Sequence, residues 1–367
     1  MKKKLRVALL FGGKSAEHEI SLISARNVAA AMDEKKYEVV AIGIDKQGRW
    51  HLDDGAVLLR GKKQSKVEFV DTRNAAAVMP GETATPIVRP SRAGFGGLGS
   101  LGSIDVVFPI LHGPFGEDGT VQGLLKLANL PFVGAGVLGS AVGMDKDVMK
   151  RLLRDAKIPI GKFLVFTRAD KMSFAKVKKT LGMPLFIKPA NLGSSVGISK
   201  VAKPSQFSAA VKEAFRYDNK IVIEEFIRGR EIECSVLGND NPIASLPGEI
   251  IVNRDFYSYD AKYLDDQGAR LEIPAKLPKA IVKKVRETAV RVYKKLCCEG
   301  MGRIDFFVQA NGRVLVNEIN TIPGFTQISM YPKMWEATGI SYSQLIDRLI
   351  QLAIARHRSE KHLRTAN

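Results

Sequence analysis

An alternation of apolar strands and helices limits what the first part of this chain can fold into. Residues 5–13, LRVALLFGG, form a continuous apolar run, and residues 15–32, SAEHEISLISARNVAAAM, follow with helical periodicity. Two further apolar runs, 37–44 and 104–111, and a second helical stretch, 121–130, come later. Apolar strands that alternate with helices are typical of a parallel α/β sheet. We therefore expect such a sheet in roughly the first 140 residues.

The rest of the chain divides further, because 367 residues are too many for one ordinary core. Helix 145–156, strand 184–189 and strand 198–201 indicate a second unit. Strand 221–227 leads into a third unit with helices at 278–296 and 341–356. The predicted organisation is an N-terminal α/β domain 1–140 with an irregular insertion at about 61–103, a central α+β domain 141–222, a C-terminal α+β domain 223–357 and a basic tail 358–367.

The charge balance must be weighed, since 56 Lys and Arg against 38 Asp and Glu give a net charge of +18. The basic residues are dispersed and no aromatic residues interleave with them, so we predict no nucleic-acid partner. No apolar run is long enough to cross a membrane. Cys234, Cys297 and Cys298 form neither a disulfide framework nor a zinc spacing, which fits a reducing cytoplasm.

A polar hairpin is predicted at Gly302–Phe325, GRIDFFVQANGRVLVNEINTIPGF. Asn311-Gly312 between two apolar runs favours a two-residue type I′ turn, which would place residue i opposite residue 623 − i. The pairs expected on one face are Arg303 with Asn320, Asp305 with Glu318, and Phe307 with Val316. The residues expected on the other face are Ile304, Phe306, Leu315 and Ile319.

Two carboxylates that face each other across a ladder repel, so Asp305 and Glu318 need compensation. A divalent cation is one candidate, because carboxylate and amide oxygens suit Mg²⁺. The alternative is a solvated face whose charges point into water. The hairpin alone does not decide between them.

Two glycine-containing loops favour an anionic ligand. His112–Gly123, HGPFGEDGTVQG, follows an apolar strand and opens a helix, where backbone amides attract anions. The plainer interpretation is a turn with an N-cap. Phe186–Gly197, FIKPANLGSSVG, joins Lys188 to a Gly-Ser loop that lets amides approach a phosphate closely. It is neither a Walker A loop nor a dinucleotide fingerprint. The alternative interpretation is a flexible glycine loop without function.

Together, a phosphate loop, the lysines Lys146 and Lys188 and a carboxylate hairpin indicate a nucleotide and phosphoryl transfer, which depends on positioning and charge neutralisation. Seven motifs along nearly the whole chain resemble the D-alanine-D-alanine ligase family of the ATP-grasp superfamily. In order, they are LFGGKSAEHEIS, HGPFGEDGTVQG, MDK, KPANLGSSVG, FYSYDAKY, GRIDFF and NEINTIPGF. The resemblance implies an ATP-grasp fold, with a Rossmann-like N-terminal domain and ATP gripped between the second and third domains.

The resemblance also implies the ATP and metal ligands. Two Mg²⁺ (or Mn²⁺) ions would be bound by Asp305, Glu318 and Asn320. Residues that would contact ATP are Lys146 and Lys188 at phosphates, Ser195 through its backbone, Glu224, Glu225, Phe226 and Ile227 at adenine, Glu231 at ribose and Lys262 at the γ-phosphate.

The implied reaction joins two D-alanine molecules through a D-alanyl phosphate, for peptidoglycan precursor synthesis in the cytoplasm, with a homodimer implied by family analogy. Residues with implied roles in substrate binding or catalysis are Glu17, Ser194 and Tyr263 around the first ammonium, His112 beside it, Arg303 and the Gly324 amide at the oxyanion, and Ser329 and Met330 at the second carboxylate.

Ser258 and Asp260 depart from the family's common Asp and Glu, which leaves the closing contacts of the lid open. Two alternative functions are compatible with the same motifs. One is a relative that makes D-alanyl-D-lactate or D-alanyl-D-serine, and Tyr263 argues against the lactate type. The other is a nucleotide or nucleic-acid binder without catalysis, against which Arg303 argues, because a binder has no use for a group aimed at a transition state.

Overall fold

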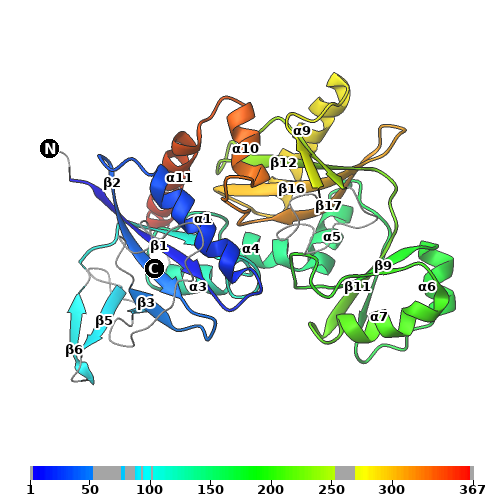
Figure 1. The fold of residues 1–367 in the computed structure, drawn as a ribbon, viewed down its shortest axis with the longest axis horizontal. Helices are drawn as coiled ribbons and strands as arrows, with labels where there is room; N and C mark the ends of the chain where they lie inside the picture. The colour runs from blue at the N-terminus through cyan, green and yellow to red at the C-terminus, as the bar shows by residue number, and fades with distance from the viewer. Residues whose placement is uncertain are drawn as a thin grey trace.

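The computed structural model describes residues 3–52, 76–78, 87–91, 94–100, 102–252 and 269–363. Three main sheets follow one another along the chain (Figure 1). Lys262, Tyr263, Ser258 and Asp260 lie outside the described residues. No helix in the described ranges combines the length and the apolar composition that a membrane span requires.

The first sheet has the order β3-β2-β1-β7, and β1 runs parallel to β2 and to β7, as predicted. Its strands are β1 Leu5–Gly12, β2 Tyr37–Ile44, β3 Trp50–Leu52 and β7 Val106–Ile110. Along β1, Val7 and Leu9 join one buried cluster while Ala8 and Leu10 join another. Both faces of β1 are therefore covered, which explains its continuous apolar sequence. The helices of this part are α1 His18–Ala31 and α3 Thr120–Leu127.

The last helix, α11 (Tyr342–Lys361), packs against the first sheet, beside α1 and β7. Leu349 and Ile350 share a core with Val7 of β1. Buried Arg356 donates hydrogen bonds to the carbonyls of Phe132 at 2.8 Å and Gly134 at 2.6 Å. The two ends of the chain therefore build one core. Figure 1 shows α11, in red, beside α1, in blue.

The segment between β3 and β7 is only partly described. Strands β4 Ala77–Val78, β5 Ile87–Ser91 and β6 Gly94–Ser100 form a small antiparallel sheet. Apart from these strands, Ala76, Gly102 and Ser103, the residues of 61–103 lie outside the described ones. Glycine-rich stretches such as β6 carry little strand signal, because glycine offers no side chain to pack.

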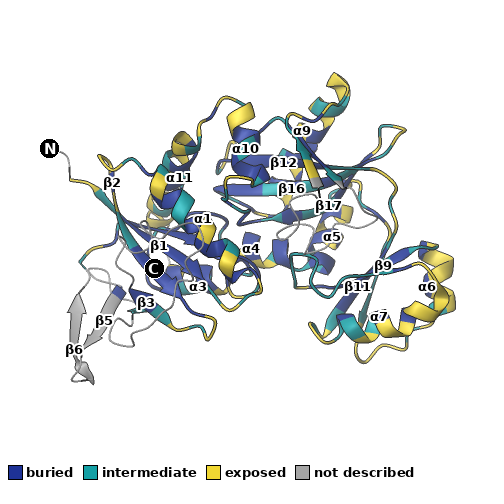
Figure 2. Ribbon diagram, viewed as in Figure 1, coloured by how far each residue is buried: buried dark blue, intermediate teal, exposed yellow. Residues whose placement is uncertain are grey.

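The second sheet is antiparallel, with the order β10-β9-β11-β8. Its strands are β8 Phe163–Thr167, β9 Leu185–Pro189, β10 Ser199–Val201 and β11 Lys220–Glu225. The helices nearby are α4 Val137–Met144, α5 Lys146–Asp155, α6 Phe174–Leu181, the short 3₁₀ helix η2 Pro204–Gln206 and α7 Phe207–Ala214. Helices α6 and α7 pack on the sheet and expose their outer faces (Figure 2).

The third sheet, also antiparallel, has the order β15-β14-β12-β16-β17, with β13 beside β12. Its strands are β12 Arg230–Leu237, β13 Ile243–Ala244, β14 Gly248–Val252, β15 Ala269–Glu272, β16 Met301–Val308 and β17 Val314–Asn320. The helices are α9 Lys279–Lys295 and α10 Met330–Ala337. The boundaries proposed for the three domains remain predictions.

The β16–β17 hairpin confirms two predicted pairs, Arg303 with Asn320 and Asp305 with Glu318. The predicted type I′ turn is wrong. The Gly312 N–H donates to the carbonyl of Gln309 and only Gly312, not Asn311, has a positive φ, +77°, as in a three-residue loop.

The predicted pair Phe307 with Val316 is also wrong, because Phe307 pairs with Leu315. A bulge at Asn317 adds one residue to β17, which restores the predicted register at Glu318. Val316 consequently packs in the core with Ile304 and Phe306, not on the polar face. The longer turn and the bulge offset each other, so the polar end of the hairpin follows the simple rule.

Candidate active site

The polar end of the hairpin gathers charges from three adjacent strands. Asp305 accepts hydrogen bonds from Nε and Nη2 of Arg303, both at 2.8 Å, and from Nδ2 of Asn320 at 3.0 Å. Glu233 of β12 pairs with Asp305 in the ladder, and its Oε2 lies 2.8 Å from Nε of Arg303. The row Glu233, Asp305, Glu318 thus crosses the sheet, with Arg303 among its carboxylates.

Arg303 supplies part of the compensation that the facing carboxylates need. Burial alone would lower its pKa, but the charges of Asp305 and Glu233 raise that pKa well above the ordinary value. The guanidinium therefore stays charged. Glu233 was not predicted from the sequence, because its place depends on the pairing of β12 with β16.

The residues of this hairpin suit a hard divalent cation. Asp305, Glu318 and Asn320 offer carboxylate and amide oxygens at paired positions, and the Arg303 fork uses only part of the accepting capacity of Asp305. No group of three or more His, Cys, Asp or Glu side chains in the described part of the chain is arranged to hold a metal. A metal here would need the amide oxygen of Asn320.

Three lysines converge near the hairpin from α5 and β9. Nζ of Lys188 donates to Oε2 of Glu224 at 2.9 Å, and Nζ of Lys150 lies 3.2 Å from Oε1 of the same carboxylate. Burial alone would raise the pKa of Glu224, but the two ammonium groups lower it to about 2. Lys150 also donates to the bulge carbonyl of Asn317 at 3.4 Å. The i, i+4 spacing of Lys146 and Lys150 on one helix is the signal that would have found Lys150.

Lys146 begins α5 and differs from Lys188. Its Nζ donates to the carbonyl of Leu192 at 2.6 Å and lies 3.9 Å from Oε2 of Glu318. Burial and the nearby charge of Lys188 lower the pKa of Lys146, whereas Glu224 raises that of Lys188 despite its burial. An added anion would therefore stabilise Lys146 in its charged form.

The predicted adenine residues follow one another at the end of β11. The Glu225 carboxylate accepts the N–H of Lys162 at 2.7 Å. Phe226 is 39% exposed, with its ring 6.3 Å from that of Phe186. Ile227 lies against Gly161, where an added Cβ would be 2.7 Å from Cδ1 of Ile227. Glu231, the predicted ribose ligand, lies on β12 opposite Phe307.

The Gly-Ser loop holds a strained backbone. Ser194 and Ser195 have φ of +52° and +60°, a left-handed conformation that costs a non-glycine residue about 1–3 kcal/mol. An added Cβ on Gly193 would lie 3.8 Å from Oε1 of Glu117. This contact brings the loop to the segment His112–Gly123.

A buried pair of carboxylates lies at that segment. Glu17, the residue before α1, and Glu117 are each 9% exposed, and the Gly113 N–H donates to Oε1 of Glu117 at 3.0 Å. Burial and the charge of Glu17 raise the pKa of Glu117 to about 8. Burial lowers the pKa of His112, whose Nδ1 is 3.0 Å from the carbonyl of Ile322, so its imidazole is neutral. Arg303 acts electrostatically on both Glu117 and His112.

The segment after β17 contains the remaining predicted residues. An added Cβ on Gly324 would meet Oγ of Ser329 at 2.8 Å, so the two residues are in contact. Oγ of Ser329 accepts the N–H of Thr326 at 2.9 Å. The Met330 side chain is buried with Ile250 and Met334, so a contact from Met330 to a substrate would come from its backbone.

Two family models match the chain. The one described as D-ala D-ala ligase N-terminus matches residues 6–135, and the one described as D-ala D-ala ligase C-terminus matches residues 152–351. The chain belongs to the D-alanine-D-alanine ligase family. The expected fold of this family is confirmed, with a parallel N-terminal sheet followed by antiparallel sheets.

Relatives resemble the chain over its whole length. A D-alanine-D-alanine ligase of Shouchella clausii (strain KSM-K16) is 51% identical over 366 residues, which are 99% of this chain and 98% of that protein. The solved D-alanine-D-alanine ligase from Coxiella burnetii has a TM-score of 0.86 and 42% identity, covering 98% of this chain and 96% of its own.

Two further structures of the family differ in what their names record. The VanG D-Ala:D-Ser ligase from Enterococcus faecalis has a TM-score of 0.84 and 36% identity, with 96% of this chain and 100% of its own covered. A D-alanine-D-alanine ligase from Bacillus anthracis complexed with ATP has a TM-score of 0.72 and 27% identity, with 97% and 99% covered.

Proposed function

We propose that this protein joins two D-alanine molecules into D-alanyl-D-alanine at the expense of ATP, for peptidoglycan precursor synthesis in the cytoplasm. The observation that carries the proposal is the convergence of Lys146, Arg303 and the buried Glu17–Glu117 pair, on a chain that is 51% identical to a D-alanine-D-alanine ligase. Family analogy adds a homodimer to the proposal.

ATP would lie between the second and third sheets. Glu224, held ionised by Lys150 and Lys188, can accept a hydrogen bond from the adenine amino group, and Glu225, Phe226 and Ile227 would line the base. Glu231 would bind the ribose. Lys146, Lys188, the Ser195 amide and Lys262 would neutralise phosphates.

Asp305, Glu318 and Asn320 would hold two Mg²⁺ ions, which supply charge neutralisation between the phosphates when bound. Arg303 keeps Asp305 oriented through its two hydrogen bonds. The hairpin thereby presents its oxygen donors on a rigid element of the sheet.

The first D-alanine would bind with its ammonium at Glu17, beside Ser194, Tyr263 and neutral His112. Its carboxylate oxygen attacks the γ-phosphorus, the bond to the ADP oxygen breaks, and an acyl phosphate results. The amine of the second D-alanine then attacks the acyl carbon. The C–N bond forms, the C–O bond to phosphate breaks, and the departing phosphate takes the proton that the nitrogen loses. Ser329 and Met330 would hold the second carboxylate.

Arg303 and the Gly324 amide would stabilise the oxyanion that forms in this second attack. Arg303 suits that role because it stays charged and acts electrostatically on Glu117 of the buried Glu17–Glu117 pair. A donor of this kind contributes about 10²–10³ in rate.

The decisive assay measures phosphate release from ATP with D-alanine, L-alanine, D-serine or D-lactate as the added substrate. We expect phosphate release when D-alanine is the sole added amino acid. D-serine should be accepted only as the second substrate, in the presence of D-alanine. Turnover with L-alanine alone would overturn the proposal. Product analysis by mass spectrometry separates D-alanyl-D-alanine from a D-alanyl-D-serine product.

A further inference from the structure

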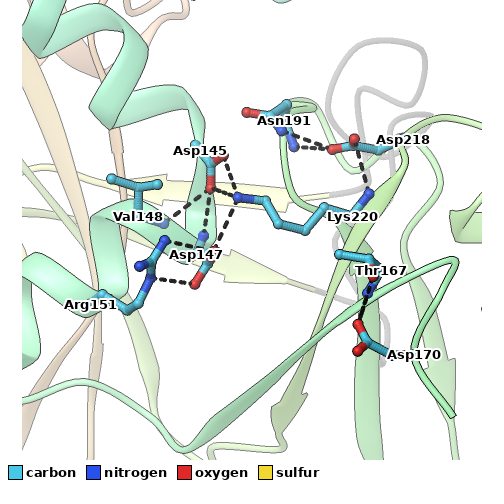
Figure 3. Close-up of polar contacts among 9 residues, drawn as sticks. All are labelled: Asp145, Asp147, Val148, Arg151, Thr167, Asp170, Asn191, Asp218 and Lys220. Carbon is cyan, nitrogen blue, oxygen red and sulfur yellow. Dashed lines mark hydrogen bonds and ion pairs between the residues drawn. The ribbon is translucent and has the colours of Figure 1, made fainter. Parts of the chain in front are cut away.

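An ion-pair cluster ties the start of β11 to the first turn of α5 (Figure 3). Nζ of Lys220 donates to Oδ1 and Oδ2 of Asp145 at 2.9 and 2.6 Å and to Oδ2 of Asp147 at 3.1 Å. Asp145 is also the N-cap of α5 and accepts the N–H groups of Asp147 and Val148. One ammonium thus fixes the residues on both sides of Lys146.

The second carboxylate of the cluster is held from its other side. Arg151, one turn along α5, donates Nε and Nη2 to the two oxygens of Asp147 at 2.8 and 3.0 Å. Burial alone would lower the pKa of Lys220, but Asp145 and Asp147 raise it. The cluster is therefore charged at neutral pH.

The same end of β11 holds the phosphate loop. The carbonyl of Lys220 accepts the N–H of Ala190, and the carbonyl of Ala190 accepts the N–H of Lys146, each at 3.0 Å. Two residues earlier, Oδ2 of Asp218 accepts the backbone N–H of Asn191 at 2.8 Å and its Nδ2 at 3.0 Å (Figure 3). Lys146 and the beginning of the loop are thus joined to one strand end.

This connection stabilises the backbone conformation of the Gly-Ser loop. The left-handed serines Ser194 and Ser195 persist only where the surroundings fix the backbone. Nζ of Lys146 donates to Leu192, just before them. Any rotation of the first turn of α5 would move Lys146 and this loop contact together.

We propose that Lys220 is a positioning residue for the nucleotide phosphates, acting through Asp145 and Asp147 on Lys146 and the Gly-Ser loop. The inference rests on the ATP use proposed above. If the ion pair of Lys220 were purely structural, its removal would lower the affinity for all ligands of the site by the same factor. If Lys220 positions the groups that bind phosphate, its removal lowers the affinity most for ligands that carry more phosphates.

Calorimetric titration of the full chain with ADP and with AMP, both in Mg²⁺, separates these cases. For Lys220→Met we expect the Kd of ADP to rise about tenfold, while the Kd of AMP changes less than about threefold. Lys220→Arg keeps a cation with several donors and should restore most of the ADP affinity. Lys36→Met is the matched control, since Lys36 forms a 2.9 Å pair with Asp347 on α11.

The proposal would be overturned if Lys220→Met raised the Kd of ADP and the Kd of AMP by the same factor, or changed neither. If that variant does not fold, Asp147→Asn decides, because it keeps the shape and removes one charge facing Lys220; it should weaken ADP selectively, by a smaller factor. Wild-type protein that binds neither ADP nor ATP would refute the proposed function itself, which is a separate outcome.

Discussion

Two buried carboxylates of the site, Glu224 and Glu117, have opposite pKa shifts. At Glu224 the charges of Lys150 and Lys188 outweigh burial and lower the pKa to about 2. At Glu117 burial and the charge of Glu17 outweigh the hydrogen bonds and the charge of Arg303, and raise the pKa to about 8. At the proposed adenine end the carboxylate is therefore ionised and paired with two lysines, whereas at the proposed amino-acid end Glu117 is protonated at neutral pH.

The lysines repeat this contrast. The pKa of Lys188 is raised by its carboxylate partner, and that of Lys146 is lowered by burial. A carboxylate held ionised by lysines can accept a hydrogen bond from a neutral base, whereas a buried group whose charged form is disfavoured gains most from an added charge of opposite sign, such as phosphate at Lys146 or ammonium at Glu117. The binding energy of charged substrates would therefore act at Lys146 and Glu117. Four measurements test this contrast.

The largest effect is expected for Arg303→Ala, which removes the cation shared by Asp305 and Glu233. We expect kcat to fall about 10²-fold or more, because the oxyanion loses a donor, with ADP affinity changed much less. Steady-state kinetics and calorimetry measure the two quantities. Arg216→Ala, at an exposed pair with Glu213, serves as the control. A loss of ADP affinity as large as the loss of rate would instead make Arg303 a phosphate clamp.

Asp305→Asn tests the metal site. The sequence predicts unrelieved repulsion between Asp305 and Glu318, but Arg303 already offsets it, so the metal-free variant should be less stable by about 1–3 kcal/mol. With Mg²⁺ and ADP the stability gap to wild type should widen, because the variant also loses a ligating charge. Paired denaturant titrations with EDTA and with Mg²⁺-ADP measure it. An unchanged gap would argue against a metal here.

Lys150→Met removes one of the two lysines that pair with Glu224 at the proposed adenine end. Glu224 would keep only Lys188, and we expect the Kd of ATP to rise about tenfold. In contrast with Lys220→Met, Lys150→Met should raise the Kd of AMP and the Kd of ADP by similar factors. In the double variant with Glu224→Gln the losses should be less than additive, because the two side chains act through one contact. Additive losses would mean that Lys150 does not act through Glu224.

Glu117→Gln should have the smallest effect, visible as a pH dependence. With the pKa raised from 4.5 to about 8, unfolding releases a proton between these values, so the stability that Glu117 contributes falls as the pH rises through this window. The Tm of the variant relative to wild type should therefore rise between pH 5 and pH 9, by about 2 °C or more. Glu224→Gln is the control, since a pKa near 2 predicts no such change in that range. Parallel curves for Glu117→Gln and wild type would contradict the raised pKa.

The sequence predicts the strands and helices it names to within a few residues, because their apolar periodicity is strong. It also predicts the pairing of Asp305 with Glu318, although the turn type is wrong. The bulge at Asn317 has no local signal, since an ordinary polar residue occupies it. The faces of Leu315 and Val316 were therefore assigned incorrectly.

The site residues that sequence reasoning missed depend on long-range packing. Glu233 needs the pairing of β12 with β16, and Lys150 meets Glu224 from a different element. Glu117 lies inside a motif that was recognised, but its raised pKa comes from burial, which a sequence does not reveal. For the residues that the sequence did name, the structure brings Lys146, Lys188, Glu224, Asp305 and Glu318 together through a continuous set of contacts.

The packing of α11 on the first sheet has a consequence for biosynthesis. Helix α11 ends at Lys361, and the core it completes begins at Val7. A ribosome adds residues one by one from the N-terminus, so β1 and α1 are made long before their last partner. During that interval, apolar surface that later faces Leu349 and Ile350 has no cover from α11. The N-terminal strands of a nascent chain must therefore wait until α11 has been synthesised before their core closes.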